Sequence, residues 1–130
     1  MAKRIREKAE KVKATREQRP HATAKYVRIS PDKVRVVLAL IRGRSVTDAM
    51  AILQATPKAA SEQIFKVLNS AAANAEHNKD MSISDLYVAE AYADPGPTLK
   101  RYQPVSKGRA HHILKRTSHI TVILDTKEEL

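Results

Sequence analysis

The sequence predicts an α+β fold, in which a small three-stranded antiparallel sheet packs against three helices and a long β-hairpin protrudes. Three observations support this prediction. Apolar residues recur at helical spacing through the middle of the chain, alternate with polar residues before and after it, and are sparse in a cationic segment between the last two alternating stretches. A chain of 130 residues suits one domain with one hydrophobic core.

The first 19 residues are polar and basic, with eight Lys or Arg against three Glu. Ile5 and Val12 are too few apolar side chains to pack firmly, even if the segment forms a loose helix. We therefore expect residues 1–19 to be a basic, mobile N-terminal tail, and residues 20–130 to form the single globular domain.

The first alternating stretch covers residues 24–29. Val27 and Ile29 are expected on one face, and Tyr26 and Arg28 on the other. This pattern is typical of a short, half-buried strand, which would open the domain.

Three helices are expected next. The first begins at Ser30-Pro31, because Ser is a preferred N-cap and Pro suits the first helical position. The second begins at Ser45, and the third runs from Thr56-Pro57 to about Asn78. The apolar stripes expected to face the core are Val34, Val37, Leu38 and Ile41, then Val46, Ala49, Met50 and Leu53, then Ala60, Ile64, Val67, Leu68, Ala71 and Ala75.

Two further strands are expected over residues 86–93 and 117–124, where apolar residues alternate again. Each would turn one face toward the helices and leave the other polar. The side chains expected on the core-facing side are Leu86, Val88 and Tyr92, and Ile120, Val122 and Leu124.

The segment between these strands, at about residues 94–116, is the expected hairpin arm. A structureless loop of this length is uncommon in a compact domain, whereas each arm of a hairpin would span ~10 residues, or ~33 Å. A two-stranded ribbon alone is marginal in water, so a partner should supply the missing packing. A disordered surface loop is the alternative interpretation.

The charge distribution indicates what that partner is. The chain carries a formal net charge of +10, yet residues 45–94 hold three Lys and seven acids, while residues 95–116 hold six Lys or Arg and no acid. Segregation of this kind favours a polyanion-binding face. Arg101 and Arg109 suit bidentate contacts to phosphate, the lysines act as point charges, and Tyr102 suits stacking on a base.

Other function classes find little support. The chain has no Cys, no apolar run long enough to span a membrane and no secretory signal, so we expect a cytoplasmic protein without membrane partners. Three Gly residues do not make a Gly-rich phosphate loop, and no catalytic constellation is evident. His111 and His112 should point to opposite faces of a strand. We therefore expect no catalytic residue, no metal site and no cofactor.

Several ordered motifs resemble the large-subunit ribosomal protein twenty-two family of bacterial type, over about residues 22–125. They are Ala24-Lys25-Tyr26-Val27-Arg28-Ile29-Ser30-Pro31 with Lys33-Val34-Arg35, Ile41-Arg42-Gly43, Val67-Leu68-Asn69-Ser70-Ala71 with Ala73-Asn74-Ala75, and Gly96-Pro97-Thr98-Leu99-Lys100-Arg101 with Lys115-Arg116-Thr117-Ser118-His119-Ile120-Thr121. The sequence departs from residues common in the family at Val105, Ser106 and the pair His111-His112.

The resemblance implies a structural constituent of the large ribosomal subunit that binds 23S rRNA and supports its folding and assembly. Its hairpin would line the nascent-peptide exit tunnel, so the expected partners are 23S rRNA, neighbouring large-subunit ribosomal proteins and the nascent peptide, with no homo-oligomer. With Tyr102, the implied rRNA-binding residues are Arg28, Ser30, Lys33, Arg35, Lys100, Arg101, Lys107, Arg109, Lys115, Arg116, Thr117, Ser118 and His119.

Two other functions, considered from the residues alone, remain alternative hypotheses. An architectural duplex-DNA-binding protein with a β-ribbon arm would use Pro104 as a wedge between base pairs. Against it, three packed helices precede a single arm, and no dimer seam is evident. An enzyme acting on RNA would need an acid–base pair, which the sequence does not suggest.

Overall fold

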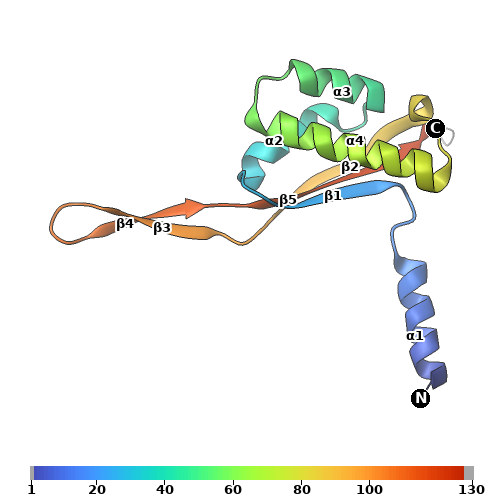
Figure 1. Ribbon diagram of the computed structural model, residues 1–130, viewed down its shortest axis with the longest axis horizontal. Coiled ribbons are helices and arrows are strands. Elements are labelled where there is room, and N and C mark those ends of the chain that lie inside the picture. Colours follow the sequence, from blue (N-terminus) through green and yellow to red (C-terminus); the bar gives the residue numbers. More distant parts are fainter. Residues whose placement is uncertain (1, 128–130) are drawn as a thin grey trace.

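The structure is a computed structural model that describes residues 2–127. These residues form an α+β body with two extensions, the arm at one end and the first helix at the other (Figure 1). The elements are α1 (Ala2–Thr15), β1 (His21–Val27), α2 (Pro31–Ile41), α3 (Val46–Ala55), α4 (Ala59–Lys79), the short 3-10 helix η1 (Ile83–Asp85), β2 (Leu86–Pro95), β3 (Leu99–Pro104), β4 (Ala110–Lys115) and β5 (Ser118–Thr126).

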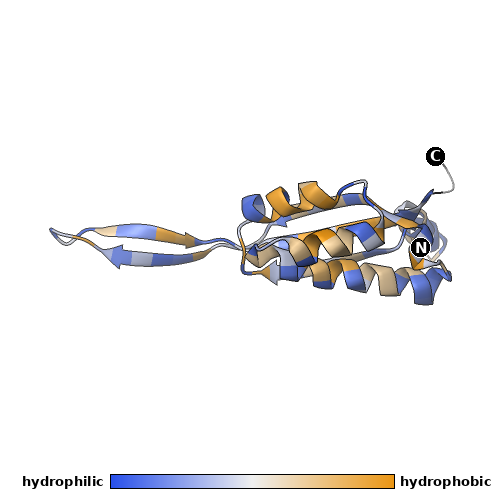
Figure 2. Cartoon of the chain, turned by 90° about the horizontal axis from the view of Figure 1, so that it is seen from above, coloured by the Kyte–Doolittle hydropathy of each residue, from blue (hydrophilic) through white to orange (hydrophobic). Residues whose placement is uncertain are grey.

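The body contains a three-stranded antiparallel sheet in the order β1-β5-β2, as the sequence predicts. Helices α2, α3 and α4 lie together on one face of it (Figure 1). Colouring by hydropathy shows broad orange stretches in the helices of the body, whereas blue and pale segments predominate in the arm (Figure 2). The predicted fold class is confirmed.

The outer edge of β2 is covered by α2 and the turn after it. The side chain of Arg42 donates from Nε to the carbonyl oxygen of Ala91 at 2.8 Å, and Arg35 donates from Nη2 to that of Ala93 at 2.9 Å. Val88 exchanges backbone hydrogen bonds with that turn. An open edge is a template for pairing with another chain, and these contacts close it.

The core lies between the helices and the sheet and consists mainly of aliphatic side chains. All the predicted stripe residues of the three helices are buried except Met50, which is partly buried against the others. Ala71 and Ala72 of α4 are also buried. Their small side chains allow α4 to pack closely on β1 and β5, the strands beneath it.

The prediction that Tyr92 shares the core face of β2 with Leu86 and Val88 is wrong. The register shifts between Val88 and Glu90, a β-bulge that changes which side chains of the strand point inward. As a result, Ala91 is buried while Tyr92 remains 39% exposed. Ile120, Val122 and Leu124 of β5 are buried as predicted.

A second bulge interrupts β1. The strand begins at His21, earlier than predicted, and its pairing with β5 shifts between Ala24 and Val27. Val27 and Ile29 pack against the core and Tyr26 is exposed, so the predicted faces are correct. Within the bulge, however, Tyr26 adopts a φ of 58°, which alternation alone does not predict.

The basic tail contains a helix, α1, which projects from the body without burying any side chain (Figure 1). Its sequence is rich in Ala, Lys, Glu and Arg, which are strong helix formers. The exposure of Ile5 and Val12 agrees with the expectation that they pack on nothing in the described chain. That the tail is mobile stays a prediction.

Candidate nucleic-acid interface

The arm is a two-stranded antiparallel ribbon made of β3 and β4. Six residues on each strand are paired, from Leu99 opposite Lys115 to Pro104 opposite Ala110. At strand rise this gives ~20 Å of paired ribbon beyond the body. At the tip, the N–H of Val105 donates to the carbonyl oxygen of Arg109 at 2.9 Å. The predicted hairpin is therefore present, with six paired residues on each strand where ~10 per arm were expected.

The tip places a lysine in a conformation that L-residues rarely adopt. Lys107 has a φ of 64° and the following Gly108 a φ of 66°. Gly accepts such a φ freely, whereas Lys does so at some cost in backbone strain. The turn thus presents the Lys107 side chain at the end of the ribbon furthest from the body.

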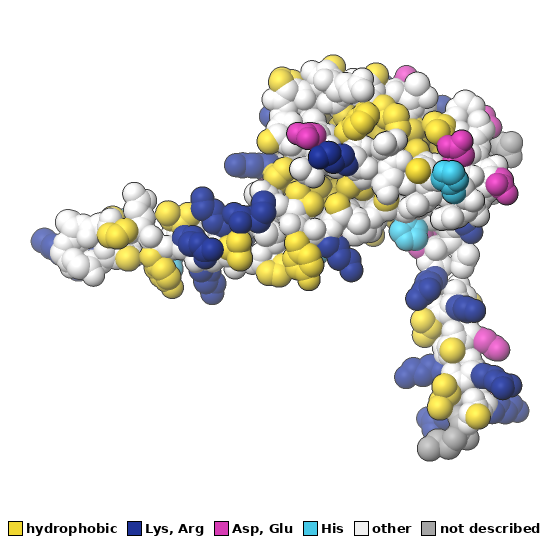
Figure 3. Space-filling view, in the orientation of Figure 1, with side chains coloured by type: hydrophobic (Ala, Val, Ile, Leu, Met, Phe, Trp, Pro, Cys, Tyr) yellow, Lys and Arg dark blue, Asp and Glu magenta, His cyan; other side chains and the backbone are white. Residues whose placement is uncertain are grey.

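Exposed cationic side chains lie on the arm, and Figure 3 shows them as dark blue groups on the half nearer the body and at the tip. Among the described residues, no acidic side chain forms an ion pair with any of them. Because no described carboxylate pairs with these cations, they are available to an external anionic partner. The six are Lys100, Arg101, Lys107, Arg109, Lys115 and Arg116.

The arm has little packing of its own. Leu114 is exposed, and Tyr102 is 62% exposed on the opposite strand. The ring of Tyr102 meets that of His112 across the ribbon, with centroids 4.8 Å apart and a tilt of 56°. One such pair adds little to the stability of a two-stranded ribbon, and such a ribbon alone is marginal in water.

The base of the arm is tightly packed around Gly96. Its N–H donates to the carbonyl oxygen of Thr117 at 2.9 Å, and the hydroxyl of Thr117 donates to the carbonyl oxygen of Pro97 at 2.6 Å. A Cβ atom on Gly96 would lie 2.5 Å from the Thr117 hydroxyl oxygen. These contacts determine the direction in which the arm leaves the sheet.

Two of the predicted RNA-binding residues are buried in this packing. Thr117 is buried with its hydroxyl bonded to Pro97, and Ser118 is buried with no hydrogen-bond partner for its hydroxyl among the described residues. His119 is partly exposed beside them. An RNA contact by Thr117 or Ser118 stays a prediction, and the exposed cations are the stronger candidates for binding an anionic partner.

The first predicted motif lies at the start of α2, on the body. Arg28 and Lys33 are exposed, while Ser30 is the half-buried N-cap of α2 and makes no side-chain capping bond. Arg35 is exposed as well, but its guanidinium bonds Ala93 and also contacts Asp32 at 3.0 Å. Arg35 thus serves the packing of α2 on β2, which the motif did not indicate.

Tyr26 and His119 meet next to the arm base, a pairing that the sequence did not predict. The N–H of Tyr26 donates to Nδ1 of His119 at 3.1 Å. The two rings pack edge to face, with centroids 5.0 Å apart and an interplanar angle of 89°. The residues are far apart in the sequence, and only the bulge in β1 brings them together. No local signal marks this contact.

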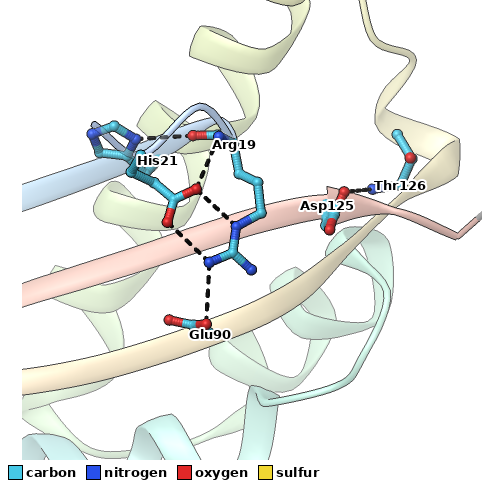
Figure 4. Close-up of polar contacts among 6 residues, drawn as sticks. Arg19, His21, Glu90, Asp125 and Thr126 are labelled. Carbon is cyan, nitrogen blue, oxygen red and sulfur yellow. Dashed lines mark hydrogen bonds and ion pairs between the residues drawn. The ribbon is translucent and has the colours of Figure 1, made fainter. Parts of the chain in front are cut away.

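At the opposite end of the sheet, an ion-pair cluster joins the segment after α1 to β2 (Figure 4). Arg19 contacts Glu17 at 2.8 Å and Glu90 at 3.1 Å. Hydrogen bonds from Arg19 lower the pKa of Glu17 from its ordinary 4.5 to about 2. Any stabilisation from this carboxylate is thus complete above about pH 4.5 and is lost as the pH falls through about 2.

Two other kinds of site are not evident in the described part of the chain. No group of three or more His, Cys, Asp or Glu side chains is arranged there to hold a metal ion. None of its helices is long and apolar enough to cross a membrane.

A cationic surface that is segregated on an exposed arm is typical of the class of proteins that bind polyanions such as nucleic acids. Sequence comparison then identifies the particular family. Residues 22–125 match the ribosomal protein L22p/L17e family, and the chain belongs to it. This result confirms the predicted family and shows that the protein is a ribosomal protein and not an enzyme. Helix α1 precedes the matched region.

Curated relatives agree with this assignment. The chain is 62% identical over 112 residues to the large ribosomal subunit protein uL22 of Desulfitobacterium hafniense (strain DSM 10664 / DCB-2), which covers 86% of this chain and 98% of that protein. It is 58% identical over 103 residues to the uL22 protein of Clostridium novyi, and this alignment covers 79% of this chain and 93% of that protein. It is 57% identical over 108 residues to the uL22 protein of Halothermothrix orenii, and this alignment covers 83% of this chain and 96% of that protein.

Proposed function

We propose that the protein is a structural constituent of the large ribosomal subunit that binds 23S rRNA through its arm. The observation that carries the proposal is the set of six exposed cations on the arm and its base, none paired with an acid in the described chain. Membership of a ribosomal protein family and the uL22 names of the relatives support rRNA as the anionic partner.

The mechanism is electrostatic. Where RNA strands converge, their phosphates repel one another, and a ribbon of Lys and Arg between them screens that repulsion and releases bound counterions. The ribbon in turn gains from the RNA the packing that its own side chains do not supply. Binding would therefore support rRNA folding during assembly of the subunit.

A more specific part of the proposal concerns the position of the arm. The resemblance to the family implies that the arm runs along the wall of the nascent-peptide tunnel, beside neighbouring ribosomal proteins. The ~20 Å ribbon and the exposed Lys107 at its tip suit such a position. Cross-linking from the tip to a nascent peptide is the measurement that tests it.

The RNA-binding role is tested by removing three lysines from the arm. We expect Lys100→Gln, Lys107→Gln and Lys115→Gln together to weaken binding to a 23S rRNA domain. If all three contact phosphates, the slope of log affinity against log salt should become shallower by about 2 to 3. Binding is measured by filter retention or anisotropy over a salt series.

The matched control removes three exposed lysines from the body, by Lys58→Gln, Lys66→Gln and Lys79→Gln. Both variants lose the same net charge, and they differ in the position of that charge and in the surface ion pair of Lys66 with Glu62 at 3.3 Å. An equal effect of the two variants would show that the arm has no special role. Duplex DNA is tested at the same salt, and tighter binding to the duplex would favour the architectural DNA-binding alternative.

A further inference from the structure

We propose that Tyr26 and His119 form a platform on which an unpaired RNA base stacks, where the arm joins the body. The ligand is a nucleobase, bound by ring stacking and distinct from the phosphates that the arm lysines contact. The inference rests on the proposed rRNA-binding function and adds a second kind of contact to it. It is carried by the conformation, exposure and fixed geometry of Tyr26.

Tyr26 is in a conformation that its side chain does not favour. Its φ of 58° lies in the left-handed region, where Gly or Asn is the unstrained choice and a bulky aromatic residue is a marked outlier. The strain arises at the bulge, where Lys25 and Tyr26 together face the single residue His119 of β5.

The strain is not explained by packing, because the Tyr26 side chain is 65% exposed. An aromatic ring usually contributes to the fold by burying its surface, and this ring buries little. Strained residues persist where the surrounding structure holds them, and they cluster at binding sites. The exposure and the strain together point to a role for the ring outside the fold.

The ring is held in one position. The hydrogen bond from Tyr26 N–H to His119 Nδ1 fixes the backbone, and the perpendicular ring packing engages at most one face of the Tyr26 ring. His119 is itself confined, since a Cβ on Gly96 would lie 3.2 Å from its Cε1 atom. A preorganised ring loses little entropy when a ligand stacks on it.

The charges nearby favour a base over a phosphate at the platform itself. Asp94 lies directly opposite His119 on β2, so a carboxylate borders the platform and repels phosphate. Lys25 and Arg28, both exposed and close to Tyr26 in the chain, are available for the backbone of the same nucleotide strand. Unpaired bases that stack on aromatic side chains are a general mode of RNA recognition.

The test compares Tyr26→Asn with Tyr26→Phe in the full chain, using the same 23S rRNA domain. Asn tolerates a positive φ but cannot stack as an aromatic ring does, whereas Phe keeps both the ring and the strain. We expect Tyr26→Asn to lower the affinity about 5- to 150-fold, the range that removal of one base–aromatic stack gives. The salt slope should not change, because no charge is removed.

Two further measurements separate stacking from other roles. Tyr26→Phe should bind within about twofold of the wild type, and equal losses in both variants would assign the effect to the hydroxyl and overturn the inference. Thermal melting of free Tyr26→Asn protein should match or exceed that of the wild type, because the strain is relieved. A clearly lower melting temperature would show that Tyr26 serves the fold, and would also overturn the inference.

The inference and the proposed function fail in different ways. If the arm lysine variant has a shallower salt slope while Tyr26→Asn binds as the wild type does, the platform is absent and the RNA-binding function stands. If the arm variant keeps the wild-type slope, the proposed arm function fails. The affinity of Tyr26→Asn for the RNA domain would also be unchanged if the ring contacted a neighbouring protein instead of RNA, and that result would likewise overturn the inference.

Discussion

At the scale of the residue, the arm base depends on a glycine whose missing side chain is essential. Gly96 allows the backbone of the outgoing strand to approach Thr117 closely enough for the hydrogen bond from its hydroxyl to the Pro97 carbonyl. The same close approach confines His119. One residue therefore affects both the direction of the arm and the proposed stacking platform.

We predict that Gly96→Ala destabilises the protein by about 1–3 kcal/mol, because the added Cβ overpacks a site that has no room for it. Urea unfolding measures the change. The control is Gly108→Asn at the arm tip, where a Cβ would have no other atom within 4 Å and Asn accepts the φ of 66°. Equal stability of the two variants would contradict the assignment of Gly96 as a packing position.

At the scale of the element, α1 and the arm are both extensions but differ in how they join the body. The arm continues β2 and β5 through a buried base, with Thr117 and Ser118 inside the packing. Helix α1 has no buried residue, and the contact nearest to it is the surface ion-pair cluster of Arg19. A 14-residue helix without packing is marginal in water.

We predict that starting the chain at Glu17, which removes α1 and keeps the Arg19 cluster, leaves the unfolding free energy within about 0.5 kcal/mol of the full chain. The physical reason is that removing α1 exposes no buried surface. Urea unfolding followed by circular dichroism tests this. A loss well above 1 kcal/mol would show that α1 packs on the body in solution.

At the scale of the whole molecule, the body and the arm differ in packing and in charge. The body holds the hydrophobic core and carries the acidic middle of the chain, which suits an ordinary solvated surface. The arm holds cations and almost no core. The body therefore supplies the packing that stabilises the fold, and the arm carries the cations on which the proposed RNA binding rests.

The proposed tunnel position of the arm leads to a prediction for assembled ribosomes. The chain has no Cys, so Ser106→Cys creates a single attachment site for a photo-cross-linker at the arm tip. We expect cross-links to the nascent peptide of a translating ribosome. The same label at Ser84→Cys, an exposed position on η1 in the body, should give none. Equal cross-linking from both positions would argue against a tunnel-lining arm.

Local periodicity and charge predict the strands, the three packed helices and the cationic arm, so these elements can be recognised without the structure. Val34, Ile64 and Val122 are buried where their spacing predicted. The family was also visible in the motifs, and the match over residues 22–125 confirmed it.

The two bulges, in β1 and β2, are visible only in the three-dimensional structure, as are the side-chain positions that they change. A bulge depends on how one strand pairs with another far away in the chain, so alternation within one strand cannot reveal it. For this reason alternation predicts the wrong face for Tyr92, and it predicts neither the strained backbone of Tyr26 nor the contact of Tyr26 with His119. The burial of Thr117 and Ser118 follows from the same close pairing at the arm base.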